Sequence, residues 1–66
     1  MRPIIAVKIK SWRQKNCLTQ KELGERLGVT AQTISKWERE DCYPDITLLP
    51  VIAELLSCTV NDFFDK

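Results

Sequence analysis

The sequence predicts an all-α domain, compact and built from five short helices. Apolar residues recur at spacings of three and four residues along most of the chain, which is the helical period. Threonines stand where four of these helices would begin, and the connections between helices are only a few residues long. Because 66 residues can bury one core at most, we expect residues 1–66 to form a single domain.

The first helix is expected over residues 4–15. Ile5, Ile9 and Trp12 follow one another at spacings of four and three, so they form a single apolar stripe. Asn16 is expected to end the helix.

The second and third helices are predicted from their caps. Thr19 is the expected N-cap of the second helix, because Glu22 follows three residues later and the two can form a capping box. Gly28 is expected to end this helix, since glycine readily adopts the left-handed conformation. Thr30 then caps the third helix.

The join between these two helices is also constrained. Gly24 lies on the face of the second helix that turns toward the third, where a small residue allows a close crossing. Glycine in a helix interior costs about 1 kcal/mol relative to alanine, so close packing explains its presence. Val29 is expected to be buried and to set the crossing angle.

The fourth helix is predicted from the apolar run between residues 48 and 56. It is apolar nearly all round, so we expect it to be the central buried helix. Pro50 belongs in its first turn, where the missing N–H costs no hydrogen bond. A start at Thr47 satisfies this, whereas a start at Asp45 would lose one bond, so Thr47 is the favoured cap.

The fifth helix is short and begins at Thr59, with Asp62 completing a second capping-box pattern. Its apolar residues include Phe63 and Phe64. We expect the tryptophans to pack in the core, and these two phenylalanines to pack there or at a dimer contact, rather than stack on bases.

The composition argues against an enzyme, a metalloprotein and a membrane protein. There is no histidine, the three cysteines are widely spaced, and the two glycines do not form a phosphate-binding loop. We therefore expect no catalytic residues, no metal site and no cofactor, with the cysteines as reduced thiols. No apolar run reaches about 18 residues, and Lys8 and Lys10 interrupt the apolar start as no signal peptide would allow. We expect a cytoplasmic protein.

Charge is distributed unevenly along the chain. Residues 1–39 contain nine Lys or Arg and three Glu, a net charge of +6, whereas residues 40–66 contain one Lys and six acidic residues, a net charge of −5. A chain divided in this way can present a basic face to a polyanion such as DNA. The alternative is that the basic helices merely lie near the N-terminus.

A helical wheel of residues 31–39 separates an apolar seam from a polar strip. Ile34 and Trp37 fall on one side, with Glu38 beside them. The opposite side carries residues that can hydrogen-bond to base edges or phosphates, namely Gln32, Ser35, Lys36 and Arg39. A helix with such side chains fits the DNA major groove, whose base edges present a distinguishable pattern of donors and acceptors.

The segment LTQKELGERLGVTAQTISKWE, residues 18–38, resembles the helix-turn-helix of the Xre/Cro-type, phage-repressor-like DNA-binding family. The likeness extends to I-K-S-W-R before it, and to P-D and L-L-S-C-T-V-N-D-F-F after it. The resemblance implies a lambda-repressor-like five-helix domain with its helix-turn-helix core at residues 19–39. It also implies that the recognition helix, residues 31–39, enters the major groove and that a homodimer binds a palindromic operator in double-stranded DNA.

The same resemblance assigns roles to individual residues. The base-reading positions are Ala31, Gln32, Ser35 and Lys36. The positions that contact the DNA backbone are Gln20, Thr30, Thr33, Arg39 and Lys10. A buried ion pair between the first and third helices is expected from Arg13 and Glu38.

Three residues depart from the family pattern. Cys17 stands where Gly or Asn is common, which is expected to shift the special backbone angle onto Asn16. Glu40 stands where Gly is frequent, so the third helix is expected to run longer or to end without a left-handed cap. Trp12 replaces a usual Leu and adds bulk to the core. None of these lies on the polar strip.

The resulting hypothesis is a sequence-specific bacterial or phage transcriptional regulator, a repressor that binds as a dimer. A small antitoxin or restriction-controller autoregulator is the alternative within DNA binding. From another class, a protein-interaction module could keep the fold without the DNA affinity. Such a module would tend to carry apolar or acidic residues in place of Gln32, Ser35 and Lys36.

Overall fold

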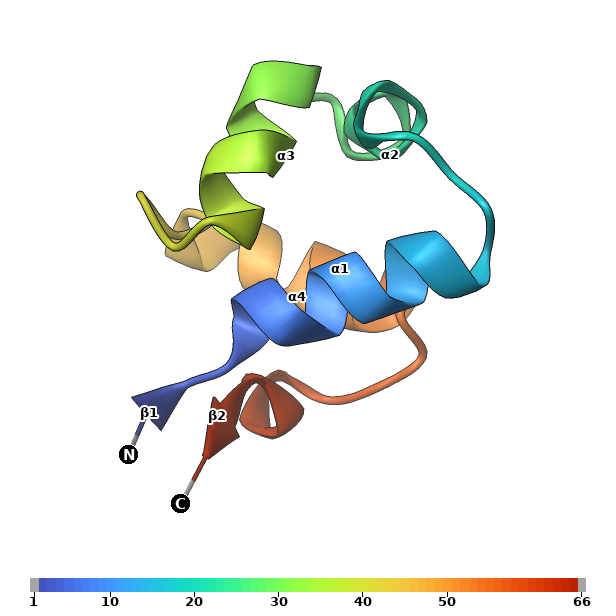
Figure 1. The fold of residues 1–66 in the computed structure, drawn as a ribbon. Coiled ribbons are helices and arrows are strands. Elements are labelled where there is room, and N and C mark those ends of the chain that lie inside the picture. Colours follow the sequence, from blue (N-terminus) through green and yellow to red (C-terminus); the bar gives the residue numbers. More distant parts are fainter. Residues whose placement is uncertain (1, 66) are drawn as a thin grey trace.

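The computed structural model describes residues 2–65 and confirms the all-α class (Figure 1). Within these residues the α-helices are α1 (Ile5–Lys15), α2 (Gln20–Leu27), α3 (Ala31–Glu38) and α4 (Leu49–Leu55). Two 3-10 helices are also present, η1 (Ile46–Leu48) and η2 (Val60–Phe63), together with two short strands, β1 (Arg2–Pro3) and β2 (Phe64–Asp65).

The expected count of five α-helices is therefore one too high, because the last helix is the 3-10 turn η2. Thr59 precedes this turn, and its N–H donates to the Asp62 carboxylate over 3.0 Å. This hydrogen bond lowers the pKa of Asp62. Phe64 then leaves the helical region, at φ −126° and ψ 132°, and pairs with β1. Strand pairing thus begins where an α-helix would have continued.

The strands β1 and β2 join the two ends of the described chain. They are antiparallel, with Pro3 opposite Phe64, and the Ile4 N–H donates to the Phe63 carbonyl oxygen over 2.7 Å. In Figure 1 this ladder lies below α1, whereas α3 lies above it. Strands of two residues are too short to show an alternating pattern, so the sequence carries no signal for them.

The predicted caps of α2 and α3 are confirmed. Glu22 N–H donates to the Thr19 hydroxyl over 3.1 Å, and Thr19 N–H donates to the Glu22 carboxylate over 2.8 Å, which completes the capping box. Gly28 ends α2 in the left-handed region at φ 76°. Thr30 caps α3 by accepting the Thr33 N–H over 3.1 Å. The start and direction of both helices are therefore fixed by local hydrogen bonds.

Each α-helix in residues 2–65 is followed by a residue in the left-handed region, and only after α2 is that residue a glycine. Cys17, Glu40 and Ser57, which follow the other three, have φ angles of 56°, 63° and 58°. After α3, the Asp41 N–H donates to the Lys36 carbonyl over 2.9 Å. This is the bond that defines a Schellman cap.

Two expectations about these helix ends are wrong. Asn16 has φ −95°, so the left-handed angle stays on Cys17. The helix α3 ends at Glu38 and is closed by a left-handed Glu40, so it neither runs longer nor ends without such a cap. The end of α1 is closed by the same kind of cap, with the Leu18 N–H donating to the Arg13 carbonyl over 3.0 Å. In both cases these hydrogen bonds outweigh the intrinsic preference against a left-handed non-glycine residue.

The start of α4 also differs from the expected cap at Thr47. Asp45 accepts hydrogen bonds from the Ile46 N–H over 2.9 Å and from the Thr47 hydroxyl over 2.7 Å, which begins η1. The α-helix follows from Leu49, and Pro50 lies in its first turn as predicted. A cap at Asp45 was expected to cost a hydrogen bond at Pro50. The 3-10 turn avoids this cost, because it lets Asp45 act as a cap without placing Pro50 deep in the α-helix.

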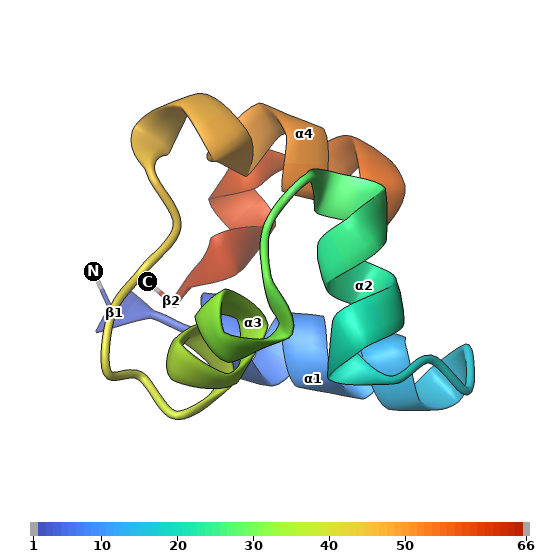
Figure 2. The same cartoon turned by 90° about the horizontal axis from the view of Figure 1, so that it is seen from above.

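The helix α4 is not the central buried element that its composition suggested. Ile52 and Ala53 are its buried residues, whereas Val51 is 48% exposed. The core instead draws on every α-helix and on η2, and its members are Ile5, Ile9, Leu23, Ile34, Trp37, Ile52, Ala53 and Phe63. Helix α3 packs against both α2 and α1. Figure 2 shows α1 and α3 together at one edge of the view and α4 at the opposite edge, with α2 running between them.

Candidate nucleic-acid interface

The α2–α3 unit is held at a close turn by Gly24. A Cβ atom at this position would lie 2.6 Å from the Val29 carbonyl oxygen and 3.1 Å from the Thr30 carbonyl carbon. A glycine is needed at position 24 because the backbone of the turn, and not α3 itself, packs against it. Val29 is half-buried and packs against the core. The contact of Val29 with the core fixes the direction in which α3 leaves the turn.

The inner side of α3 is anchored in the core. Ile34 is fully buried and Trp37 is 3% exposed. Of the outward side chains, Gln32 and Lys36 are exposed and Ser35 is half-buried. The helix therefore presents donors and acceptors to the outside while two apolar anchors prevent it from rotating.

Residues Ala31 and Thr33 stand at the first turn of α3 and are both half-buried. The Thr33 hydroxyl lies 3.0 Å from the Thr30 hydroxyl, which also caps the helix. Thr30 itself is exposed. The free N–H groups at such a helix start, together with the helix dipole, favour a phosphate.

Glu38 joins three helices through its carboxylate. Arg13 of α1 donates from Nε over 2.7 Å and from Nη2 over 3.0 Å, which makes a bidentate pair. Gln20 of α2 donates its side-chain amide over 3.2 Å to the same carboxylate. The side chains of Arg13 and Glu38 are 14% and 5% exposed. The pair is largely buried and ties α3 to the rest of the molecule.

Arg13 makes one further contact, from Nη1 to the Leu18 carbonyl oxygen over 2.9 Å. Its hydrogen bonds to Glu38 raise the pKa of the guanidinium, although burial acts in the opposite direction. Arg13 therefore stays charged and also fixes the connection between α1 and α2. The sequence could not reveal Leu18 as a partner, because the acceptor is a backbone atom that any residue supplies.

Two other residues expected at the DNA backbone lie near the C-terminal end of α3. Lys10 is exposed on α1 and lines a shallow hollow with Glu38 and Glu40. Arg39 forms an ion pair with Asp41 over 3.1 Å, and their side chains are 60% and 58% exposed. No pattern in the sequence indicates this pair. A pair this exposed is worth about 0–1 kcal/mol, so Arg39 can exchange its partner for a phosphate.

No group of three or more potential metal-ligating side chains comes together within the described part of the chain. None of the helices in residues 2–65 has both the length and the apolar character that crossing a membrane would require. The residues that were expected at DNA lie on α3, at the start of α2 and on part of α1, and these elements make up the candidate interface.

Comparison with known proteins places this arrangement in a family. A model of the helix-turn-helix family matches residues 9–63, which is most of the chain. The chain belongs to the Xre-like helix-turn-helix family. Members of this family are DNA-binding transcriptional regulators, and α2 and α3 are the two helices of the motif.

Two members of the family show different extents of similarity. The uncharacterized HTH-type transcriptional regulator YgzD of Bacillus subtilis (strain 168) is 35% identical over 57 residues, which cover 86% of each chain. The HTH-type transcriptional activator BcrR of Enterococcus faecalis is 36% identical over 55 residues, which cover 83% of this chain and 27% of BcrR. This chain therefore matches most of YgzD but spans only about a quarter of the length of BcrR.

A solved structure gives the same fold. The P22 c2 repressor protein, crystallised in complex with the synthetic operator 9T in the presence of Tl+, matches with a TM-score of 0.83 and 27% sequence identity. The match covers 94% of both chains. The whole helix-turn-helix domain, and not the motif alone, is therefore shared with that repressor.

Proposed function

We propose that this protein is a sequence-specific regulator of transcription, a repressor that binds a palindromic operator in double-stranded DNA as a homodimer. The observation that carries the proposal is the division of α3. Ile34 and Trp37 hold one side in the core, while Gln32 and Lys36 stand exposed on the other. An α-helix anchored in this way can place its outer side chains in the major groove.

The outward residues have chemistry suited to base edges. Gln32 can pair bidentately with adenine, and Lys36 can reach the O6 and N7 atoms of guanine or a phosphate. Ala31 can meet a thymine methyl group, and Ser35 can donate to or accept from either kind of edge. These four residues are proposed to read the sequence.

The flanking residues are proposed to hold the protein on the DNA backbone. Gln20 and the start of α3, with Thr30 and Thr33, would face one phosphate group, where the helix dipole adds attraction. Lys10 and Arg39 would contact the backbone near the other end of α3. Phosphate contacts position the helix, and base contacts give the specificity.

Selection of bound sequences from random duplex DNA tests the proposal directly. We expect enrichment of a palindrome whose half-sites lie about one helical turn apart, about 10 base pairs. Equal affinity for random duplex and for the best selected site would rule out operator recognition. Reporter expression with that site placed over a promoter then separates a repressor from an activator.

The variant Gln32→Ala tests base reading. It should lose about 1–3 kcal/mol of binding free energy on the selected site and relax the preference at one base pair. The control is Asn61→Ala, which removes a side-chain amide from an exposed position in η2, outside the candidate interface. Equal effects of both variants on specificity would contradict a reading role for Gln32.

The variant Arg39→Ala tests the backbone contacts. It should weaken binding to all duplexes alike and lower the salt slope by about one unit, because one phosphate contact is lost. Lys15→Ala removes a charge from the exposed end of α1 and should have a smaller effect. An unchanged salt slope for Arg39→Ala would show that Arg39 does not contact a phosphate.

A further inference from the structure

An ion pair spans the sharp turn that follows α3. Arg39 comes directly after α3 and Asp41 two residues later, and Arg39 Nη2 lies 3.1 Å from an Asp41 carboxylate oxygen. Arg39 is also one of the residues proposed to contact the DNA backbone. A carboxylate and a phosphate both offer anionic oxygens to the planar guanidinium, so Asp41 occupies a donor group that a phosphate would use.

An exchange of partners by Arg39 requires side chains to move but not the backbone. The Arg39 N–H donates to the Ser35 carbonyl oxygen over 3.0 Å, and the Asp41 N–H donates to the Lys36 carbonyl oxygen over 2.9 Å. Both backbone positions are thus tied to the last turn of α3. The side chains of Arg39 and Asp41 are each more than half exposed, so a phosphate can reach the guanidinium from solvent.

Helix stability does not account for a carboxylate at position 41. Three other acidic side chains accept backbone N–H groups close to helix starts, namely Glu22, Asp45 and Asp62. Asp41 instead follows the C-terminal end of α3, where the helix dipole favours a cation and disfavours an anion. Among the hydrogen bonds and ion pairs of residues 2–65, the Asp41 carboxylate has Arg39 as its only partner. The charge of Asp41 therefore acts on a residue of the proposed DNA contact.

We propose that Asp41 competes with DNA phosphate for Arg39 and thereby lowers the sequence-independent part of the DNA affinity. Contact with a phosphate requires Arg39 to leave Asp41, and the carboxylate released in this way repels the same phosphate. Neither effect depends on which bases α3 meets, because phosphate contacts carry no direct sequence information. This competition rests on the proposed function, in which Arg39 contacts the DNA backbone, and makes Asp41 the residue that limits the contact.

Binding of the full chain to two duplexes of equal length measures the competition. One duplex contains the selected site and the other a scrambled sequence, and both are titrated at about 50 mM salt. Asp41→Asn keeps the size of the side chain and the backbone N–H but removes the charge. It should bind both duplexes about threefold to tenfold more tightly than wild type, and by the same factor. The gain should shrink as salt is raised to about 300 mM, because salt screens exposed charges.

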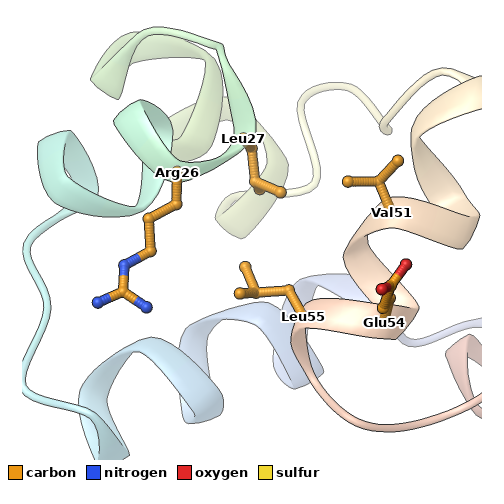
Figure 3. Close-up of a pocket in the computed structure, with 5 residues that line it drawn as sticks. All are labelled: Arg26, Leu27, Val51, Glu54 and Leu55. Atoms are coloured by element: carbon orange, nitrogen blue, oxygen red, sulfur yellow. The ribbon is translucent and has the colours of Figure 1, made fainter.

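Two controls separate the release of Arg39 from a change in net charge. Glu40→Gln removes the same charge one residue earlier, and Glu40 belongs to neither ion pair of residues 2–65. Glu54→Gln removes it on α4, where Glu54 is exposed beside the groove between α2 and α4 (Figure 3) and lies outside the candidate interface. Both variants should stay within about twofold of the wild-type affinity. Circular dichroism melts of each variant verify that it is folded.

The decisive comparison is made in the Arg39→Ala background. Without Arg39 there is no guanidinium to release, so adding Asp41→Asn to Arg39→Ala should raise the affinity by less than about twofold. The ratio between the gain with Arg39 present and the gain without it measures how strongly the two side chains are coupled in DNA binding. A gain that remains without Arg39 is the general effect of removing a negative charge near DNA.

Two results would overturn the proposal. One is an Asp41→Asn protein that gains no more affinity than Glu40→Gln on either duplex. The other is a gain of the same size with and without Arg39, which would mean that the carboxylate repels DNA without holding Arg39. Failure of operator recognition gives a different result, namely equal wild-type affinity for the two duplexes. The coupling of Arg39 with Asp41 is then still measured on the scrambled duplex.

Discussion

The ion pair at Glu38 allows a quantitative test of how α3 is held. Glu38→Gln keeps the size of the side chain and removes its charge, which leaves Arg13 facing a neutral amide. An exposed pair would cost about 0–1 kcal/mol to break, and a fully desolvated pair about 3–5 kcal/mol. With side chains 14% and 5% exposed, this pair stands near the buried limit. We expect a loss of about 2–4 kcal/mol in the free energy of unfolding.

Urea unfolding measures this loss, with fluorescence from the two tryptophans as the probe. Trp12 and Trp37 are next in sequence to Arg13 and Glu38, and Trp37 is buried. In a domain of this size about 1 kcal/mol corresponds to about 4–8 °C in Tm, so we expect Tm to fall by at least about 8 °C. A change of less than about 0.5 kcal/mol would refute the buried pair.

Two further variants show whether charge or packing is responsible. Glu25→Gln makes the same chemical change at an exposed position of α2 and should stay within about 0.5 kcal/mol of wild type. The double variant Arg13→Met, Glu38→Leu should recover much of the stability lost in Glu38→Gln, because no uncompensated buried charge remains. It should still bind operator less tightly if the pair also orients α3.

Three more predictions concern the turns and caps. Glu40→Gly should stabilise the fold by about 1 kcal/mol in urea titrations. A left-handed non-glycine residue, here at φ 63°, costs about 1–2 kcal/mol, and the greater freedom of glycine in the unfolded chain offsets only part of that gain. Glu25→Gly inside α2 should destabilise the fold instead, and equal effects of the two variants would contradict the strain at Glu40. Gly24→Val should destabilise by about 2 kcal/mol, because a Cβ atom would lie 2.6 Å from the Val29 carbonyl oxygen; an unchanged denaturation midpoint would mean that the turn moves freely. Hydrogen bonds from the backbone and hydroxyl of Thr19 lower the pKa of Glu22. The ionised Glu22 therefore stabilises the fold above the unfolded-state pKa, and this stabilisation is lost as pH falls through the lower folded-state pKa. The Tm difference between wild type and Glu22→Ala should therefore shrink between about pH 5 and pH 2, and a difference independent of pH would refute this origin.

The features that the sequence predicted correctly are those set by short-range patterns. Thr19 and Glu22 form their capping box from a spacing of three residues, and that spacing is visible in the chain itself. The inward side of α3, with Ile34 and Trp37, follows from the helical period alone. Local chemistry decides both features, so tertiary structure was not needed to predict them.

Some of the features that it missed depend on contacts distant in sequence, and others on a local backbone conformation that no sequence pattern decides. The left-handed angle at Glu40 and the two-residue strands have no short-range signal that distinguishes them from other outcomes. The exposure of Val51 depends on where α4 packs, whereas its composition suggested burial on every side. At the candidate site, the polar strip was predictable, but the Arg39 pair with Asp41 required the path of the loop after α3. The contacts to bases and phosphates stay predictions.

The ladder of β1 and β2 has a consequence for how the molecule opens. It closes a loop that contains nearly the whole chain, and closing a long loop costs more chain entropy than closing a short one. Two residues per strand offer few hydrogen bonds in return. We therefore expect the ladder to detach in local openings while α1, α2 and α3 stay assembled, with fast amide hydrogen exchange at both ends. Phe63 is fully buried and comes directly before β2 in the chain, so each opening would briefly expose the part of the core that Phe63 fills.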